Sequence, residues 1–163
     1  MTGSKILVET GEINILVDCG MFQGLKELRL LNWKSIPFDA GKIDFVLLTH
    51  GHLDHVGYLP RLFKQGFRGS VIGTAPTLEI AEIILRDSAK IHLEEAKKAN
   101  QEGYSRHHPA LPFYSMDEVD KVLQRFTHCE RDDWFDLSDS IRCRMRYNGH
   151  ILGACFIELE IDQ

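Results

Sequence analysis

The sequence lacks the features of a membrane or secreted protein. Its 163 residues contain no apolar run near the roughly 20 residues of a membrane helix, and its start has no signal-peptide pattern. Its four cysteines lie far apart with no Cys-x-x-Cys pair, which argues against a zinc ribbon and a disulfide framework. Such cysteine usage suits a reducing compartment, so we expect a cytoplasmic protein that binds no membrane.

An excess of basic charge is also missing, because the formal net charge is −5 at pH 7. Contact with nucleic acid would therefore come from a local patch or from a region outside this chain. The sequence has no repeat and no low-complexity segment. With 44% hydrophobic and 26% charged residues in 163 positions, it has the composition and length of one globular domain.

Apolar periodicity predicts alternating strands and helices. The predicted strands cover residues 5–9, 13–18, 43–49, 70–73, 141–147 and 155–161, and the first two form a hairpin. The predicted helices cover residues 25–33, 53–63, 74–98 and a segment after Ser115, with a loop at residues 101–116. Ser115 and Glu118 have the spacing of a helix capping box. Six residues of the third helix form one predicted buried stripe: Leu78, Ala81, Ile84, Leu85, Ser88 and Ile91.

The most informative segment is Thr-His-Gly-His-Leu-Asp-His at residues 49–55, where a predicted strand ends and a helix begins. In extended backbone His50 and His52 point to the same side, because side chains alternate with a period of two. These two imidazoles can therefore share one metal ion. Asp54 and His55 fall at the turn into the helix and can face a second metal. Burying all four groups without partners would cost several kcal/mol.

A further histidine, His150, lies in the loop Asn-Gly-His-Ile-Leu-Gly-Ala between the last two predicted strands. A catalytic zinc usually takes three protein ligands and leaves a fourth position open. His50, His52 and His150 would supply that set, so we predict that His150 is the third ligand. The alternative is a loop histidine without a ligand role.

The last two predicted strands carry opposite charges. Arg142, Arg144 and Arg146 alternate along one face of the first strand, and Glu158 and Glu160 lie on the second. The arginine row is a candidate phosphate-binding strip. We favour the alternative, in which these arginines pair with the two glutamates across adjacent strands.

The strand, the Thr-His-Gly-His-Leu-Asp-His motif and the helix together resemble the signature of the metallo-β-lactamase superfamily. Asp18, in Ile-Leu-Val-Asp-Cys-Gly, resembles the family's first motif, an aspartate that supports a ligand histidine without binding metal. The Gly-His-Ile-Leu-Gly-Ala segment is similar to the third motif of the RNA-processing β-CASP branch, which includes ribonuclease J and the polyadenylation endonuclease subunit. Residues 87–91 and 111–115 are also similar to that branch.

The resemblance implies a partial metallo-β-lactamase domain over residues 1–163. Its fold class is α/β (α+β in some schemes), an αββα sandwich whose mixed sheet is flanked by helices. The family has an earlier strand. After the strand that ends at Ile161 it continues to a bridging aspartate, the β-CASP insert and a last metal-binding histidine. We therefore expect the amino-terminal part of a longer enzyme, weakly active or inactive alone.

The chemistry that the resemblance implies is zinc-dependent hydrolysis of RNA phosphodiesters, by an endonuclease, a 5′-exonuclease or both. Two zinc ions would share a hydroxide that attacks phosphorus. His50, His52 and His150 would hold the first zinc. Asp54 and His55 would hold the second and act in catalysis, and Asp54 would orient the nucleophile or accept its proton. This chain is expected to hold one zinc or fewer well.

The expected partner is RNA, with single-stranded DNA as an alternative substrate and a homodimer as a further expectation for the intact protein. Two other functions stay open. One is a hydrolase of the same fold that acts on a small thioester or lactone, against which the Gly-His-Ile-Leu-Gly-Ala motif argues. The other is a non-catalytic RNA-binding or scaffold relative. Such relatives usually lose ligands within the His-x-His-x-Asp-His motif, which is complete here.

Overall fold

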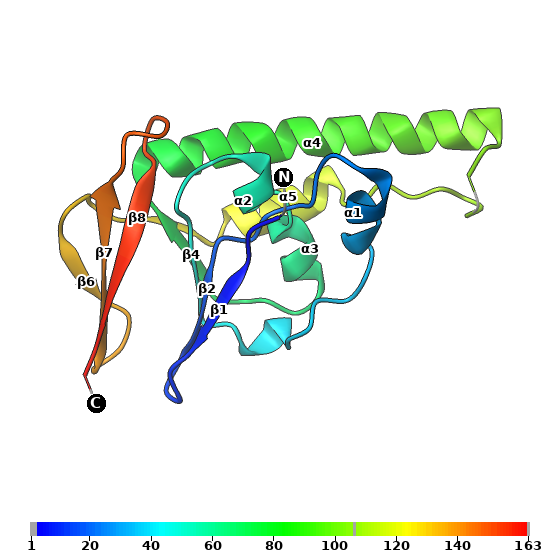
Figure 1. Ribbon diagram of the computed structural model, residues 1–163. Coiled ribbons are helices and arrows are strands. Elements are labelled where there is room, and N and C mark those ends of the chain that lie inside the picture. Colours follow the sequence, from blue (N-terminus) through cyan, green and yellow to red (C-terminus); the bar gives the residue numbers. More distant parts are fainter. Residues whose placement is uncertain (1–2, 106, 163) are drawn as a thin grey trace.

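The computed structural model describes residues 3–105 and 107–162, which form two β-sheets with helices on one side (Figure 1). Residues 1, 2 and 163 of the predicted domain, and residue 106 of the predicted loop, lie outside this description. The strands are β1 (Ile6–Glu9), β2 (Asn14–Val17), β3 (Phe45–Leu47), β4 (Ser70–Gly73), β5 (Phe126–His128), β6 (Trp134–Asp136), β7 (Ile141–Tyr147) and β8 (Cys155–Ile161). The helices are α1 (Lys26–Leu31), the 3₁₀ turn η1 (Ala40–Lys42), α2 (Leu53–Val56), α3 (Leu59–Lys64), α4 (Ala75–Glu102) and α5 (Met116–Leu123).

The larger sheet has five strands in the order β1-β2-β3-β4-β5. Strands β1 and β2 form the predicted antiparallel hairpin, with Ile6 opposite Val17. Strands β2 to β5 run parallel to one another. Because the carboxyl ends of parallel strands meet at one edge of a sheet, the segments that follow β2, β3 and β4 are brought together there.

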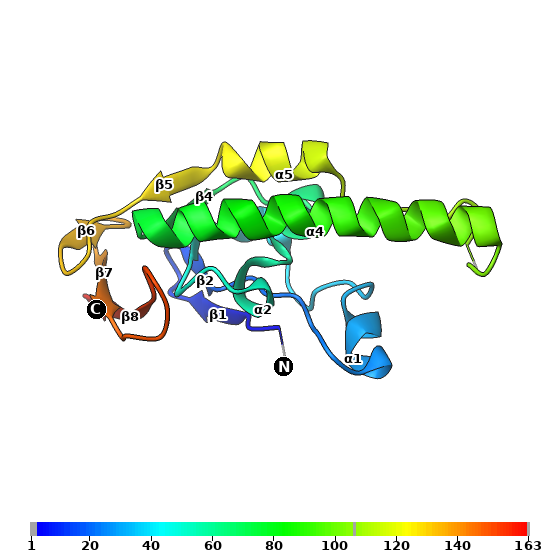
Figure 2. The same ribbon diagram turned by 90° about the horizontal axis from the view of Figure 1, so that it is seen from above.

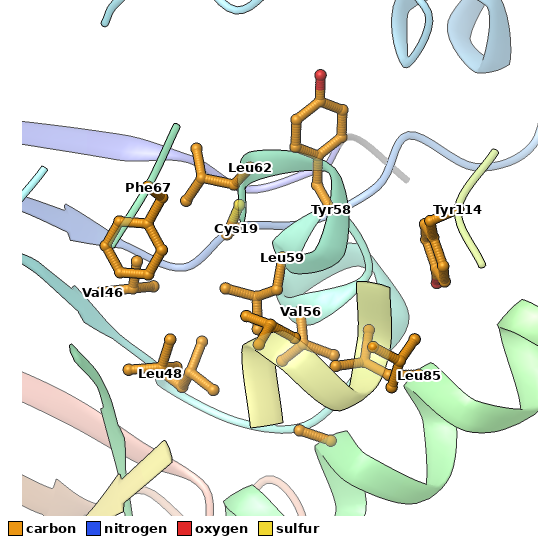
Figure 3. Packing of buried hydrophobic residues seen from close by; sticks show 14 of the residues in the cluster. Cys19, Val46, Leu48, Val56, Tyr58, Leu59, Leu62, Phe67, Leu85 and Tyr114 are labelled. Carbon is orange, nitrogen blue, oxygen red and sulfur yellow. The ribbon is translucent and has the colours of Figure 1, made fainter. Parts of the chain in front are cut away.

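The smaller sheet, β6-β7-β8, is antiparallel and packs against one face of the larger sheet. The interface between the sheets is apolar and contains, among others, Ile15, Leu47, Ile72, Ile141 and Met145. The opposite face of the larger sheet packs against the helices, and Figure 3 shows Val46 and Leu48 facing Val56, Leu59 and Leu85. The predicted mixed sheet flanked by helices is confirmed. The described residues form the helix–sheet–sheet layers of the predicted αββα sandwich.

Helix α4 is the longest element and extends beyond the sheets (Figure 2). It begins after Thr74 as predicted and ends at Gly103, whose φ of 68° places it in the left-handed region that favours glycine. Four of the six stripe residues are buried: Leu78, Ala81, Leu85 and Ser88. Ile91 was predicted to be buried but is 47% exposed, because it lines an open cavity beside α1, whereas Ala89, Ala96 and Ala99 form the buried side of this part of α4. None of the described helices is long and apolar enough to cross a membrane.

The predicted helix over residues 53–63 is wrong in one respect, because the structure divides it into α2 and α3. The Tyr58 backbone N–H donates to the Cys19 carbonyl oxygen at 2.9 Å. In a continuous helix this N–H would instead donate to the carbonyl oxygen four residues earlier. A tertiary hydrogen bond thus ends the first helix. Strands β5 and β6, of three residues each, were not predicted. Strand β3 is equally short but lies within a longer apolar run at residues 43–49, which made it recognisable.

The arginine row pairs across the strands, as favoured from the sequence. In the register of β7 and β8, Arg142 lies opposite Glu160 and Arg144 lies opposite Glu158. The nitrogen–oxygen distances of these two pairs are 2.8 and 2.6 Å. Arg146 has its closest ion-pair contact with Asp132, at 3.1 Å. The arginines are therefore engaged with carboxylates and do not form a free phosphate-binding strip.

Replacement of Ser115 by alanine tests the capping box of α5. The Ser115 hydroxyl accepts from the Glu118 backbone N–H at 3.3 Å, and the Glu118 carboxylate accepts from the Ser115 N–H at 2.8 Å. Ser115→Ala is expected to lower the free energy of unfolding by about 1 kcal/mol, measured by urea denaturation. Exposed Ser35 is the control, since Ser35→Ala should change stability by less than about 0.5 kcal/mol. Equal losses in both variants would contradict the capping role.

Candidate metal centre

Three histidines from two distant parts of the chain meet at the edge where the parallel strands end. His50 and His52 follow β3, and His150 lies in the loop between β7 and β8. Their ring centres are 4.8 Å apart for His50 and His52, 4.9 Å for His50 and His150, and 5.1 Å for His52 and His150. One ring nitrogen of each lies within 4.8 Å of the others. The structure thus brings together the three predicted ligands of the first metal.

The donor set fits a metal ion. Zinc holds imidazole nitrogens at about 2.0–2.1 Å, so neighbouring ligand nitrogens of a tetrahedral site lie roughly 3.4 Å apart. Nitrogens within 4.8 Å of one another reach that spacing by small side-chain rotations. Burial, and next the nearby His55, lower the pKa of His50 to about 4. His50 is therefore neutral near pH 7, which is the form of imidazole that binds metals.

Asp18 connects the second half of the motif to the sheet. It follows β2, is 2% exposed, and has a φ of 60°, in the left-handed region that aspartate adopts more readily than most residues. Its carboxylate accepts from the Thr49 backbone N–H at 2.8 Å, from the Thr49 hydroxyl at 2.8 Å, and from His55 Nδ1 at 2.7 Å. Three donors thus compensate the burial of this charge.

His55 is oriented by Asp18. Because Nδ1 donates to the carboxylate, Nε2 is the nitrogen left to face the site, and it lies 3.8 Å from Asp54 Oδ2. The hydrogen bond with Asp18 is the main reason that the pKa of His55 is raised. Asp54 is 8% exposed. The structure therefore places Asp54 and His55, the two predicted ligands of a second metal, side by side. The ring centres of His55 and His50 are 3.9 Å apart. The ligand role of Asp54 and His55 stays a prediction.

Thr49 links Asp18 to His50, the first of the predicted ligand histidines, and this role of Thr49 was not predicted. Its hydroxyl lies 2.8 Å from Asp18 Oδ2 and 2.9 Å from His50 Nδ1. A hydroxyl has one hydrogen to donate, which goes to the carboxylate, so it accepts from the Nδ1–H of His50. Nε2 of His50 is then free to bind a metal. A hydroxyl residue between a buried strand and a histidine motif is the sequence signal for such a link.

The amino-terminal end of α4 positions the loop that carries His150. The Gly153 carbonyl accepts hydrogen bonds from the hydroxyls of Thr74 at 2.8 Å and Thr77 at 2.9 Å. Gly153 has a φ of 78°, and a Cβ atom there would lie 2.7 Å from the Thr77 nitrogen. The Cys155 N–H also donates to the Thr49 carbonyl at 2.8 Å. Thr74 occupies the predicted N-cap position of α4, but its hydroxyl makes no capping hydrogen bond to the helix and donates to the Gly153 carbonyl instead.

Histidines gathered at the strand ends of an α/β sandwich, beside a carboxylate, form a donor set that could hold a metal ion. The family model of the metallo-beta-lactamase superfamily matches residues 3–90, slightly more than half of the chain. The chain belongs to this superfamily.

Comparison with characterised proteins identifies relatives within it. A ribonuclease of Thermus thermophilus is 36% identical over 157 residues, which cover 96% of this chain and 32% of the relative. The transcription termination factor FttA of Methanosarcina mazei is 31% identical, and the match covers 97% of this chain and 23% of the relative. Integrator complex subunit 11 of Danio rerio is 28% identical, and the match covers 97% of this chain and 25% of the relative. The predicted RNA-processing β-CASP branch is confirmed. The chain spans about a quarter to a third of the length of these relatives.

Solved structures confirm the fold. A subclass B3 metallo-β-lactamase with an active-site glutamic acid superposes with a TM-score of 0.53 at 22% identity, covering 96% of this chain and 50% of that one. A subclass B3 metallo-β-lactamase of Bradyrhizobium japonicum gives a TM-score of 0.51 at 18% identity, and the superposition covers 96% of this chain and 50% of that one. At these identities the likeness shows the fold alone.

Replacement of Thr49 by valine tests the link between Asp18 and His50. Valine keeps the shape but removes the hydroxyl, so His50 loses the acceptor that fixes its ring. We expect Thr49→Val to weaken zinc binding by about 10–100-fold in competition with a chromogenic chelator.

Thr49→Ser is the matched control, because serine keeps the hydroxyl, and it should bind zinc nearly as well as the original chain. Thermal unfolding without metal checks that both variants are folded. If the valine and serine variants bound zinc with the same affinity, the link would have no role in holding His50.

Proposed function

We propose that this chain carries the zinc-binding half-site of a ribonuclease and that the intact protein hydrolyses RNA phosphodiesters. The observation that carries the proposal is the meeting of His50, His52 and His150 beside the Asp54–His55 pair. The relatives support the substrate class, because one is named a ribonuclease and another a transcription termination factor. Single-stranded DNA is the alternative substrate.

Zinc is the proposed metal because three imidazoles and one open position are typical of catalytic zinc. When bound, zinc lowers the pKa of a water ligand and stabilises negative charge on phosphoryl oxygens. His50, His52 and His150 would hold the first ion. Asp54 and His55 would contribute to a second.

The chain's own residues would then hold and orient the reactants. Asp54 lies beside His55 and is almost fully buried, so its carboxylate is well placed to orient the attacking water and to accept its proton at Oδ2. Asp18 keeps the His55 ring in one orientation through the Nδ1 hydrogen bond. His150 is exposed, whereas His50 is 7% exposed, so substrate would enter from the His150 side.

Zinc titration tests the metal site. We expect the chain to bind fewer than two zinc equivalents, because among the described residues the second set offers only Asp54 and His55. Replacement of His52 by alanine should remove the tightly bound zinc, measured by elemental analysis and chelator competition. His128→Ala is the control, since His128 is exposed and lies outside the cluster. A fully occupied site of two ions in the original chain, or zinc retained by His52→Ala, would contradict this prediction.

Hydrolysis assays test the substrate class. The zinc-loaded chain is expected to cleave single-stranded RNA weakly, and Asp54→Asn should slow cleavage by about 100-fold or more while the first zinc is retained. The same preparation is assayed on single-stranded DNA and on a glutathione thioester. Thioester hydrolysis without RNA cleavage, or RNA cleavage that persists in Asp54→Asn, would show that the proposed function is wrong.

A further inference from the structure

A second feature of the molecule is the cavity beside α1. It has a volume of about 820 Å³ and is lined by α1, the carboxy-terminal part of α4 and residues 104 and 110–113. Figures 1 and 2 both show α1 beside this part of α4. Cavities of roughly 300–1,000 Å³ are typical of ligand sites, so this one has room for about one or two nucleotides.

The cavity begins beside the candidate metal centre. Met21 and Leu53 line the end nearest the histidine motif, and Leu53 stands between the motif residues His52 and Asp54. The Met21 backbone N–H donates to the Leu53 carbonyl oxygen at 3.1 Å, which attaches this end of the cavity to the motif. A polymer whose reacting group lies at the histidines therefore has this cavity as a neighbouring surface.

The α1 side of the cavity is held in place by a buried amide. Asn32 is 5% exposed. Its side chain accepts from the Phe22 backbone N–H at 2.8 Å and donates to the Phe22 carbonyl at 2.9 Å. These two hydrogen bonds attach the end of α1 to the loop after β2. The cavity is therefore a formed surface of the fold.

Aromatic rings line the cavity with much of their surface uncovered. Trp33 is 53% exposed and Tyr104 is 61% exposed. Buried Phe113 holds Trp33 in place, with ring centres 5.0 Å apart and ring planes at 75°, an edge-to-face contact. A planar ring that is held by its neighbours but remains uncovered is a platform on which a nucleic-acid base stacks.

The two helices contribute opposite charges to the cavity. Exposed Lys26 and Arg29 are three residues apart on α1 and lie on one face of it. Exposed Asp87 and Glu95 lie on either side of Ile91 on α4, at a spacing of four residues that places all three on one face. In the described part of the chain, none of these four charges takes part in an ion pair closer than 4.0 Å. These charges are therefore available to a ligand.

We propose that the cavity beside α1 holds the nucleotides of a single-stranded RNA that adjoin the phosphate at the metal centre, an inference that rests on the proposed function. Bases stack on Trp33 and Tyr104, phosphates face the basic side chains of α1, and base edges face the carboxylates of α4. Grooves that combine basic side chains with exposed aromatic rings bind single strands in this way. In a chain of net charge −5, α1 supplies the local basic patch that such binding needs.

The carboxylates of α4 set the orientation of the strand and favour bases that carry an amino group. Carboxylates only accept hydrogen bonds, so Asp87 and Glu95 repel phosphates and turn them toward α1. Cytosine presents an exocyclic amino group as a donor, whereas uracil presents a carbonyl oxygen at the same position. Cytosine is therefore preferred over uracil in this cavity.

Tryptophan fluorescence tests the stacking. The chain contains two tryptophans, and Trp134→Phe leaves Trp33 as the only one. Trp134 lies on β6 and does not line the cavity. In EDTA, which prevents metal-dependent cleavage, an oligocytidylate of about eight nucleotides should quench the Trp33 emission to saturation, because a stacked base quenches the indole.

Replacement of the aromatic rings tests the same contact in the full 163-residue chain, by fluorescence anisotropy of the labelled RNA in EDTA. Trp33→Leu should weaken binding at least about fivefold, because it removes the stacking face. Trp33→Phe is the matched control, since it keeps a planar ring and should bind nearly as well as the original chain. Tyr104→Leu is a second variant at an exposed position, and thermal unfolding checks that all three are folded.

The salt dependence of binding tests the phosphate contacts. Lys26→Ala combined with Arg29→Ala should weaken binding and reduce the slope of log K against log salt by roughly 1.4, because each phosphate contact of a single strand contributes about 0.7. Lys42→Ala combined with Arg125→Ala is the matched control. It removes the same charge from exposed positions outside the cavity and should leave the slope unchanged.

A comparison of two RNAs tests the base edges. Oligouridylate of the same length should bind at least about threefold more weakly than oligocytidylate. Asp87→Asn combined with Glu95→Gln should remove this preference, because amides both donate and accept hydrogen bonds. Glu79→Gln combined with Glu94→Gln, at exposed positions of α4 outside the cavity, should keep it.

The outcomes separate this proposal from the proposed function. His52→Ala should lose zinc and cleavage but bind RNA in EDTA like the original chain, and RNA held in the cavity without hydrolysis would overturn only the proposed function. Unchanged binding in Trp33→Leu, equal losses in the two pairs of basic-residue variants, or a preference for uridine would each overturn this proposal, even in a chain that cleaves RNA. A Trp33 emission that changes with protein concentration but not with RNA would assign the cavity to a protein surface instead.

Discussion

The buried carboxylate of Asp18 is the group on which the geometry of the candidate metal centre depends. A charge that is 2% exposed is stable only if donors surround it, and the donors here are the Thr49 N–H, the Thr49 hydroxyl and His55. These groups come from the ends of two neighbouring strands and from α2. The need to satisfy one carboxylate therefore fixes where two histidines of the motif lie and which of their nitrogens face the site.

The third histidine is held by a separate set of contacts. Its loop is attached to α4 by two threonine hydroxyls on the Gly153 carbonyl, and to the end of β3 by the Cys155–Thr49 backbone bond. This loop connects β7 and β8 of the smaller sheet. The apolar packing between the two sheets therefore sets the distance between His150 and His50. The metal centre is thus a product of the whole sandwich, and one side stays open at exposed His150.

Helix α4 contributes both to the candidate metal centre and to a cavity beside α1. Its amino-terminal end holds the His150 loop through Thr74 and Thr77, and its carboxy-terminal part buries Ala96 and Ala99 while Ile91 lines a cavity beside α1. The cavity begins at Met21 and Leu53, so it starts beside the histidine motif and continues along α4.

The sequence by itself determined the features that depend on neighbouring residues. The spacing of His50, His52, Asp54 and His55, the β1–β2 hairpin and the capping box of α5 are local patterns of the sequence. Alternating charges favoured pairing of the arginine row with Glu158 and Glu160, and the structure supplied the register. The family resemblance that these patterns carry predicted the fold class, which is confirmed, and a ligand set that stays a prediction.

Only the tertiary structure decided the features that join distant segments. The Thr74–Gly153 hydrogen bond links residues 79 positions apart, the Thr49–Asp18 bond links residues 31 apart, and the Tyr58–Cys19 bond divides a helix that periodicity predicts as continuous. No local sequence pattern indicates which hydroxyl group will be buried next to which carbonyl or carboxylate group. The physical reason is that a hydrogen bond of this kind depends on the position of both partners in the packed sandwich.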